Sequence, residues 1–186
     1  MRGLRRREQL VDAAIALLCE GGWQAVTTRG VAERADTNAG LIHYHFGGLP
    51  GLHAAIVRRV GELVINPLVT ELLDAPDEWA ALAAVRRLLP ETTGDERTAR
   101  LSAELLAGAT RDPALGEVLR DQLREARTQI AGRIRQLHPG WPPERAAAVA
   151  TLVAALIDGL VLHHMLDHDL PVGEALAGVE DLLRKD

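Results

Sequence analysis

The stretch TTRGVAERADTNAGLIHYHF, residues 27–46, brings hydrogen-bonding rings to the end of a short helical pattern. His43, Tyr44 and His45 lie here in a chain in which only 3% of the residues are aromatic. A short helix, a turn of a few residues and a second short helix form a unit whose second helix can enter a DNA major groove. Residues in its first turn then meet base edges, and rings at its far end can reach flanking phosphates. The alternative is that Tyr44 and His45 only cover a small helical core.

A second cluster with possible chemistry is HHMLDHD, residues 163–169. His164 and His168 are four residues apart and Asp167 is close in angle, so the three could hold a metal ion on one helix face. Histidines near the C-terminus of a helix are also favoured by the helix dipole and need no metal. We therefore expect no metal and no cofactor. The single cysteine, Cys19, is expected to be a small core residue.

Helices are the elements that must position these side chains. Thr27 is suited to cap one short helix and Asn38 the next, with residues 36–38 as a turn between them. Glycine and proline divide the rest of the chain into segments with helical periodicity. The predicted helices cover about residues 5–20, 28–35, 39–45, 49–66, 77–89, 94–110, 113–137, 144–166 and 172–184. No strand pattern or repeat is present, so the sequence predicts an all-α fold of about nine helices.

Composition and charge limit the classes of protein. At 186 residues and 47% hydrophobic content, the chain can form one or two globular domains. One cysteine excludes an internal disulfide and suits a reducing cytoplasm, and no signal peptide or uncharged apolar run of membrane-spanning length is expected. The net charge of −5 is uneven, with eight arginines and six acids in residues 1–62 but thirteen basic and twenty acidic residues in 63–186. This pattern predicts a small basic head on an acidic body.

The head resembles the tetracycline-repressor (TetR) family of bacterial transcriptional regulators over residues 7–55. The matching positions are Leu10, Ala13-Ala14, Gly22-Trp23, Thr27-Thr28-Arg29, Val31-Ala32, Gly40, His45-Phe46 and Leu52. The segment ALIDGLVLHHMLD, residues 155–167, resembles the ligand-binding and dimerisation domain of such regulators. The resemblance implies a helix-turn-helix DNA-binding domain at 1–50 and an effector-binding and dimerisation domain at 51–186. It also implies a repressor that binds a palindromic operator as a homodimer and is released by a small-molecule effector.

The resemblance further assigns residues to the DNA surface. Arg29 can donate two hydrogen bonds to a guanine, and Gly40 allows the backbone to approach the groove closely. Phe46 is expected to be a core residue. The implied DNA-binding residues are Thr27, Thr28, Arg29, Thr37, Asn38, Ala39, Gly40, Leu41, His43, Tyr44 and His45.

Several positions depart from the family pattern. Leu49 stands where a phosphate-binding lysine is usual, His43 replaces a common tyrosine, and Asp36 replaces a common glycine. Gly30 replaces an acid that would complete a capping box with Thr27. The usual backbone clamp is therefore incomplete, and the arginines at residues 5–7 are the candidates to compensate through the minor groove.

The body is expected to carry the dimer interface and the effector pocket. The 144–166 helix is apolar nearly all round, which predicts burial on both sides. A row of small residues on it is the predicted dimer interface: Ala147, Thr151, Ala155 and Gly159. The candidate pocket residues are Trp79, Leu106, Trp141, Leu160 and His163, although each of them can also be a plain packing residue.

Two other classes of function compete with the regulator. One is a helical metal-dependent hydrolase using His164, Asp167 and His168, but the sequence has no glycine-rich phosphate loop or nucleophile elbow to support it. The other is a helical adaptor that has lost DNA binding, which Leu49 keeps open. The sequence favours a cytoplasmic, non-enzymatic regulator whose partners are double-stranded DNA, a second copy and an unknown effector, without a membrane.

Overall fold

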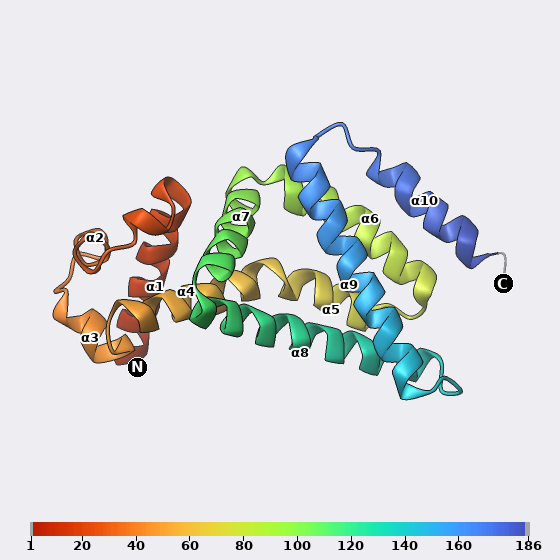
Figure 1. Ribbon diagram of the computed structural model, residues 1–186, viewed down its shortest axis with the longest axis horizontal. Coiled ribbons are helices and arrows are strands. Elements are labelled where there is room, and N and C mark those ends of the chain that lie inside the picture. The colour runs from red at the N-terminus through yellow and green to blue at the C-terminus, as the bar shows by residue number, and fades with distance from the viewer. Residues whose placement is uncertain (1, 185–186) are drawn as a thin grey trace. The chain divides into compact units, whose positions relative to one another are not determined.

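The computed structural model describes residues 2–184, and side chains in that range except those of Arg2, residues 91–93 and Leu183. All regular structure in this range is helical, which confirms the all-α prediction (Figure 1). The helices are α1 (Arg2–Gly21), α2 (Thr28–Arg34), α3 (Gly40–Phe46), α4 (Leu49–Val64), α5 (Asn66–Asp74), α6 (Glu78–Gly94), α7 (Glu96–Arg111), α8 (Pro113–Leu137), α9 (Pro143–Leu166) and α10 (Val172–Leu183), with a short 3-10 turn η1 (Trp23–Ala25).

The chain forms two compact units. The head unit comprises residues 1–63 and 100–122, so it holds α1 to α4, most of α7 and the first part of α8. Its α1 packs against α2 and η1. Nearly inaccessible apolar side chains fill its centre: Leu10, Ile15, Leu18, Val26, Val31, Ile42, Leu52, Ile56, Val57 and Val60. The head therefore has a core of its own, which holds the short helices α2 and α3.

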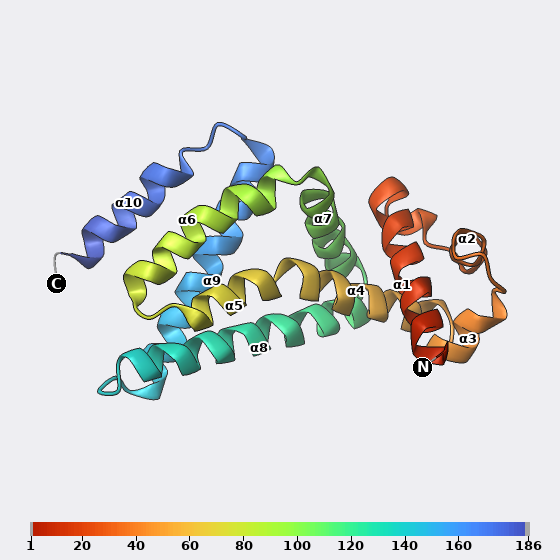
Figure 2. The same ribbon diagram turned by 180° about the vertical axis from the view of Figure 1, so that it is seen from behind.

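The body unit comprises residues 64–99 and 123–186. Within it α6 packs against α5, α9 and α10 (Figure 2). Its core consists of Leu72, Val85, Leu89, Ile130, Ala150, Ile157, Val172 and Leu176. Helix α5 was not predicted as a separate element, because Pro67 was expected only to end or kink the preceding helix. Pro67 instead lies in the first turn of α5, where its missing N–H costs no helical hydrogen bond.

Helix α9 is apolar all round, but only one of its sides is buried. Ala146, Ala150 and Ile157 face the body core, whereas Leu152 and Leu166 are 68% and 81% exposed. By length and composition α9 could cross a membrane, and only 17% of its most apolar 18-residue window is buried. The expected burial on both sides is therefore not met within the described residues of one chain. A continuous apolar face of this kind usually marks a contact surface.

Candidate nucleic-acid interface

Helix α2 begins as predicted. Thr27 is its N-cap in an extended conformation, and its hydroxyl oxygen accepts a hydrogen bond from the Gly30 N–H at 3.0 Å. Val31 and Ala32 turn inward and are buried. Although Gly30 removes one half of a capping box, the other half is formed, and it fixes the start of the helix.

The turn between α2 and α3 explains the unusual residue at position 36. Asp36 has a φ of 47°, in the left-handed region that glycine adopts most easily. Aspartate tolerates this region better than most residues do. The Asn38 side chain then accepts a hydrogen bond from the Gly40 N–H at 2.7 Å, so Asn38 caps α3 as predicted although the formal cap position is Ala39.

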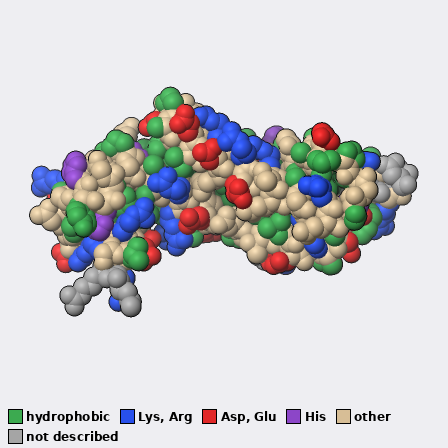
Figure 3. Space-filling view, turned by 90° about the horizontal axis from the view of Figure 1, so that it is seen from below, with side chains coloured by type: hydrophobic (Ala, Val, Ile, Leu, Met, Phe, Trp, Pro, Cys, Tyr) green, Lys and Arg blue, Asp and Glu red, His purple; other side chains and the backbone are tan. Residues whose placement is uncertain are grey.

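Helix α3 has one buried and one open side. Ile42 is fully buried, while Gly40, His43 and Tyr44 are exposed, with Tyr44 at 79%. Thr37, Ala39, Leu41 and His45 are partly exposed around the same short helix. At the left of Figure 3, arginine and histidine side chains lie close to one another among acidic and apolar groups. The α2–α3 unit therefore presents polar groups on a convex helix face, as a groove-reading element requires.

Arg29 is a highly exposed cation of this surface, and it forms an ion pair with Glu33. Its side chain is 89% accessible and donates to Glu33 one turn later at 2.8 Å. This hydrogen bond and the opposite charge of Glu33 raise the pKa of Arg29, so the guanidinium is charged at any physiological pH. Neighbouring Thr28 is partly exposed. An exposed i,i+4 pair contributes little to stability, which leaves Arg29 able to exchange Glu33 for a DNA group.

The backbone geometry of the loop GGLPG, residues 47–51, explains its three glycines. Gly47 and Gly48 have φ values of 71° and 121°, which side chains rarely adopt. A Cβ on Gly51 would lie 1.8 Å from the carbonyl oxygen of Phe46. The last turn of α3 therefore crosses the first turn of α4 at backbone contact, and only glycine at position 51 permits this approach.

Phe46 is less buried than predicted. It is half-buried, and the guanidinium of Arg7 from α1 lies 5.0 Å from its ring centroid. Arginine thus covers the ring where an apolar neighbour was expected. Residues 5–7 also belong to α1 and do not form an extended arm, because the helix begins at Arg2.

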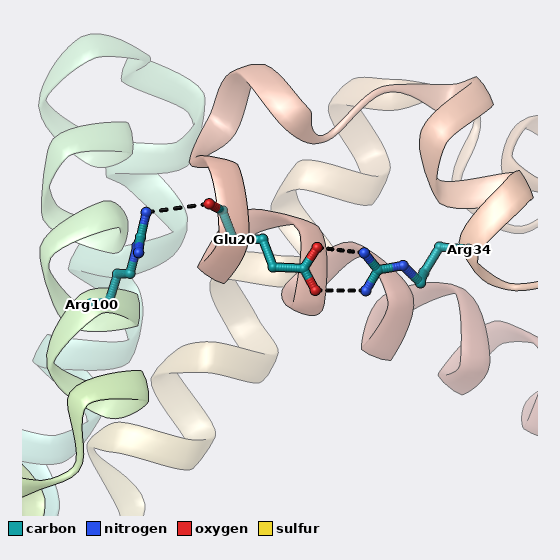
Figure 4. A network of polar contacts seen from close by, with 3 residues as sticks. All are labelled: Glu20, Arg34 and Arg100. Carbon is teal, nitrogen blue, oxygen red and sulfur yellow. Dashed lines mark hydrogen bonds and ion pairs between the residues drawn. The ribbon is translucent and has the colours of Figure 1, made fainter.

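A polar network ties α2 to α1 and α7 inside the head (Figure 4). The two terminal guanidinium nitrogens of Arg34, Nη1 and Nη2, donate to the Glu20 carboxylate, and they lower the pKa of Glu20. Arg100 of α7 donates to the backbone carbonyl of Glu20 at 3.3 Å. A bidentate pair fixes direction as well as distance, so the network holds the first helix of the motif against the rest of the head.

Trp23 forms a second connection between η1 and α7. Its indole N–H donates to the carbonyl of Glu104 at 2.7 Å. The ring lies against Gly108, where a Cβ would be 2.5 Å from the indole nitrogen. His53 of α4 contacts the other part of the ring edge-on, with centroids 5.0 Å apart. Sequence periodicity did not reveal this role of Trp23 in the head.

The five candidate pocket residues are not brought together as one set. Leu106 is 52% exposed on α7 in the head unit, whereas the other four belong to the body unit. Trp141 stacks on His138 and is covered by Arg145, and Trp79 is contacted by Arg184. Leu160 packs against the body core, and His163 is exposed on α9. A groove of about 450 Å³ between α1 and α4 is lined mainly by charged side chains and includes none of the five.

Asp158 is a candidate ligand-binding residue that was not predicted from the sequence. It is the only charged residue between Arg145 and His163. Desolvation by neighbouring protein atoms raises the pKa of Asp158, and the charge of Arg127 of α8 partly offsets this effect, although Asp158 as a residue is exposed in the single chain. A carboxylate in such an apolar stretch is a candidate for ligand recognition. Its isolation in the sequence was the available signal.

The possible metal cluster does not assemble. Helix α9 ends at Leu166, so Asp167 leaves the helix before it can share a face with His164. The rings of His164 and His168 contact each other edge-on at 5.7 Å. Across the described residues, no group of three or more His, Cys, Asp or Glu side chains is placed to hold a metal ion. The hydrolase alternative therefore lacks the ligand set on which it depended.

Comparisons with known proteins agree with this geometry. Residues 10–60 match the family model of bacterial regulatory proteins of the TetR family, and residues 77–185 match the C-terminal model of BetI-type transcriptional repressors. The HTH-type transcriptional regulator BetI of Brucella anthropi is 30% identical over 188 residues, covering 98% of this chain and 93% of the relative.

Solved structures show the same fold. A transcriptional regulator from Rhodococcus sp. Rha1 has a TM-score of 0.68 and 28% identity, covering 95% of this chain and 92% of that one. The multidrug binding protein EbrR, complexed with proflavin, has a TM-score of 0.68 and 26% identity, covering 94% of this chain and 96% of that one. The chain therefore belongs to the TetR family of bacterial regulatory proteins, with a BetI-type C-terminal domain, and is a non-enzymatic, DNA-binding transcriptional regulator.

Proposed function

We propose that this chain is a ligand-responsive repressor that binds an inverted-repeat operator as a homodimer and is released by a small-molecule effector. The observation that carries the proposal is the α2–α3 unit. Its inner side is fixed by Ile42 and by the Thr27 and Asn38 caps, and its outer side exposes Tyr44 and Arg29. A rigid short helix with a polar outer face suits major-groove recognition. The protein then acts in the cytoplasm, on double-stranded DNA.

Different residues of the groove-facing surface are proposed to contact the bases and the phosphates. Residues at the start of α3, from Thr37 to Leu41, meet base edges, because the N-terminal turn of a recognition helix lies deepest in the groove. Arg29 reads a base or a phosphate. His43, Tyr44 and His45 contact the backbone beside the site, which fixes the register of the helix.

A second copy is proposed to cover the exposed side of α9. Ala147, Thr151, Ala155 and Gly159 lie along that side, and a Cβ on Gly159 would meet nothing within 4 Å. Exposed leucines of α9 and α10 add apolar area to this face: Leu152, Leu156, Leu162, Leu166 and Leu182. Small residues allow close helix approach, and the leucines supply apolar area. A two-fold dimer would present two α3 helices to two half-sites.

The effector is proposed to be a small organic molecule bound in the body. EbrR, which shares the fold, is described in complexes with proflavin and with imidazole. Asp158 and Arg127 are the charged groups of the body that could select such a ligand, and Leu160 and Trp141 are apolar candidates. Release of DNA would follow if the effector binds better to a form of the dimer that does not fit the operator.

Selection of bound duplexes from a random pool tests the proposal. The enriched sequences are expected to contain two half-sites in inverted orientation. Arg29→Ala should then cost about 1–3 kcal/mol of binding free energy and relax preference at one base pair if Arg29 reads a base. The matched control is Arg87→Ala in the body, which also removes an exposed arginine from an ion pair, here with Glu71 at 2.8 Å. No enrichment, or equal losses in the two variants, would contradict the proposal.

A further inference from the structure

We propose that Arg7 is a DNA-phosphate contact, and that the ring of Phe46 positions it beside the α3–α4 turn. The inference rests on the proposed function and adds to it a cation from α1, outside the helix-turn-helix itself. Its phosphate would be one that flanks the half-site, next to those reached by the rings of α3.

The position of Arg7 follows from a continuous row of contacts. Its guanidinium carbon lies 5.0 Å from the ring centroid of Phe46, the last residue of α3. The row continues edge-to-face from Phe46 to His45 at 6.2 Å and from His45 to Tyr44 at 4.9 Å. Tyr44 is 79% exposed, and Arg7 is exposed as well. Arg7 and Tyr44 are therefore the exposed side chains at the two ends of this row of contacts.

The chemistry of a guanidinium over a ring fits this role. A guanidinium that stacks on a ring by its face keeps the N–H donors in its plane available. These donors match two oxygens of one phosphate. A ring that restrains the side chain also reduces the conformational entropy lost when the phosphate binds.

The distribution of charge in the head also favours Arg7. Four other arginines of the head form ion pairs: Arg29 with Glu33, Arg34 with Glu20, Arg59 with Glu62 and Arg120 with Glu117. In the part of the chain that the structure describes, Arg7 has no carboxylate within ion-pair distance. The same holds for Arg5, Arg6 and Arg58, and of these four arginines Arg7 is the one that lies over the Phe46 ring. The turn it adjoins, residues 47–51, has no charged side chain, and Leu49 begins α4. Arg7 thus supplies a cation from another helix where the turn has none.

The salt dependence of binding tests this role, because a purely structural cover for Phe46 would not change it. The slope of log affinity against log salt is measured for the parent, Arg7→Ala and Arg87→Ala on the selected operator and on a random duplex. Arg7→Ala should reduce the magnitude of the slope by about 0.9, with similar loss on both duplexes. Arg87→Ala removes the same charge from an exposed side chain of the body unit and should leave the slope near the parent value.

Variants of Phe46 test the positioning. Phe46→Leu keeps the charge but removes the ring, so its slope should move toward that of Arg7→Ala, and the double variant should show no further change. Phe46→Tyr keeps the ring and should retain the parent slope. Urea unfolding of each variant checks that the head is folded.

The outcomes separate the two proposals. If the parent binds a selected duplex and Arg7→Ala keeps its slope, or if Arg87→Ala changes it equally, the Arg7 assignment is wrong while the regulator proposal stands. If Phe46→Leu keeps the full slope, the positioning by the ring is wrong. If the parent binds no duplex at all, both proposals fall.

Discussion

At the scale of residues, His53 of α4, a partly buried side chain of the head, is expected to make the stability of the head sensitive to pH. Its Nε2 lies 3.5 Å from the Val26 carbonyl oxygen, and its ring contacts Trp23. Burial lowers the pKa of His53 below its usual 6.5. The folded head therefore disfavours the imidazolium form, and the unfolded chain binds the proton more readily.

The sign of the pH effect follows from this difference. Stability from neutral His53 is fully present above the unfolded pKa of 6.5 and is lost as the pH falls through 6.5 toward the lower folded pKa. The free energy of unfolding, measured in urea from pH 8 to pH 5.5, should fall more steeply in the parent than in His53→Gln. Parallel curves for the two proteins would show that His53 does not titrate differently on folding.

Residues also show what the sequence could and could not predict. Thr27 and Asn38 were predicted as caps because capping depends on neighbours within three residues. The partner of Phe46 was not predicted, because Arg7 is 39 positions away in the sequence and meets the ring only after α1 and α3 pack. Contacts between helices carry no local signal, and the surroundings of His53 were not predicted for the same reason.

At the scale of elements, Gly108 is where α7 approaches the loop before the helix-turn-helix. A Cβ there would lie 2.5 Å from the indole nitrogen of Trp23 and would displace its hydrogen bond to Glu104. Alanine favours helix by about 1 kcal/mol over glycine, but overpacking costs about 1–3 kcal/mol and the lost hydrogen bond about 1 kcal/mol more.

Gly108→Ala is therefore expected to lower the free energy of unfolding by about 1–3 kcal/mol in urea titrations. Gly132→Ala is the matched control, because Gly132 lies inside α8 and a Cβ there meets nothing within 4 Å. It should raise stability by up to about 1 kcal/mol. If Gly108→Ala were as stabilising as the control, Trp23 would not be fixed against α7 as the structure has it.

Helix boundaries were the most predictable part at this scale. The long helix at residues 113–137 begins and ends as expected, because Asp112-Pro113 is a strong start signal. Helix α6 was expected to end near Pro90 but continues to Gly94, and Pro90 is exposed there. Proline removes one helical hydrogen bond, yet a helix can continue past it where the ring meets solvent and not a packed neighbour.

At the scale of the whole molecule, the main feature that a single chain leaves unexplained is the apolar side of α9 that is exposed to solvent. Periodicity predicted that α9 is apolar all round, but it could not tell which side belongs to the chain's own core and which to a partner. Leu152, 68% exposed, and Leu166, 81% exposed, now locate the open side. A second copy of the chain, as proposed, would cover this side and would also supply a second recognition helix.

The mass of the protein–operator complex tests this account most directly. Sedimentation equilibrium of the full chain with the selected duplex should give two chains of 20.1 kDa for each operator, or four if two dimers bind. The same chain without DNA should already sediment as a dimer at micromolar concentration. A complex with one chain for each duplex, or a monomer with and without DNA, would contradict the dimeric, inverted-repeat mode of binding.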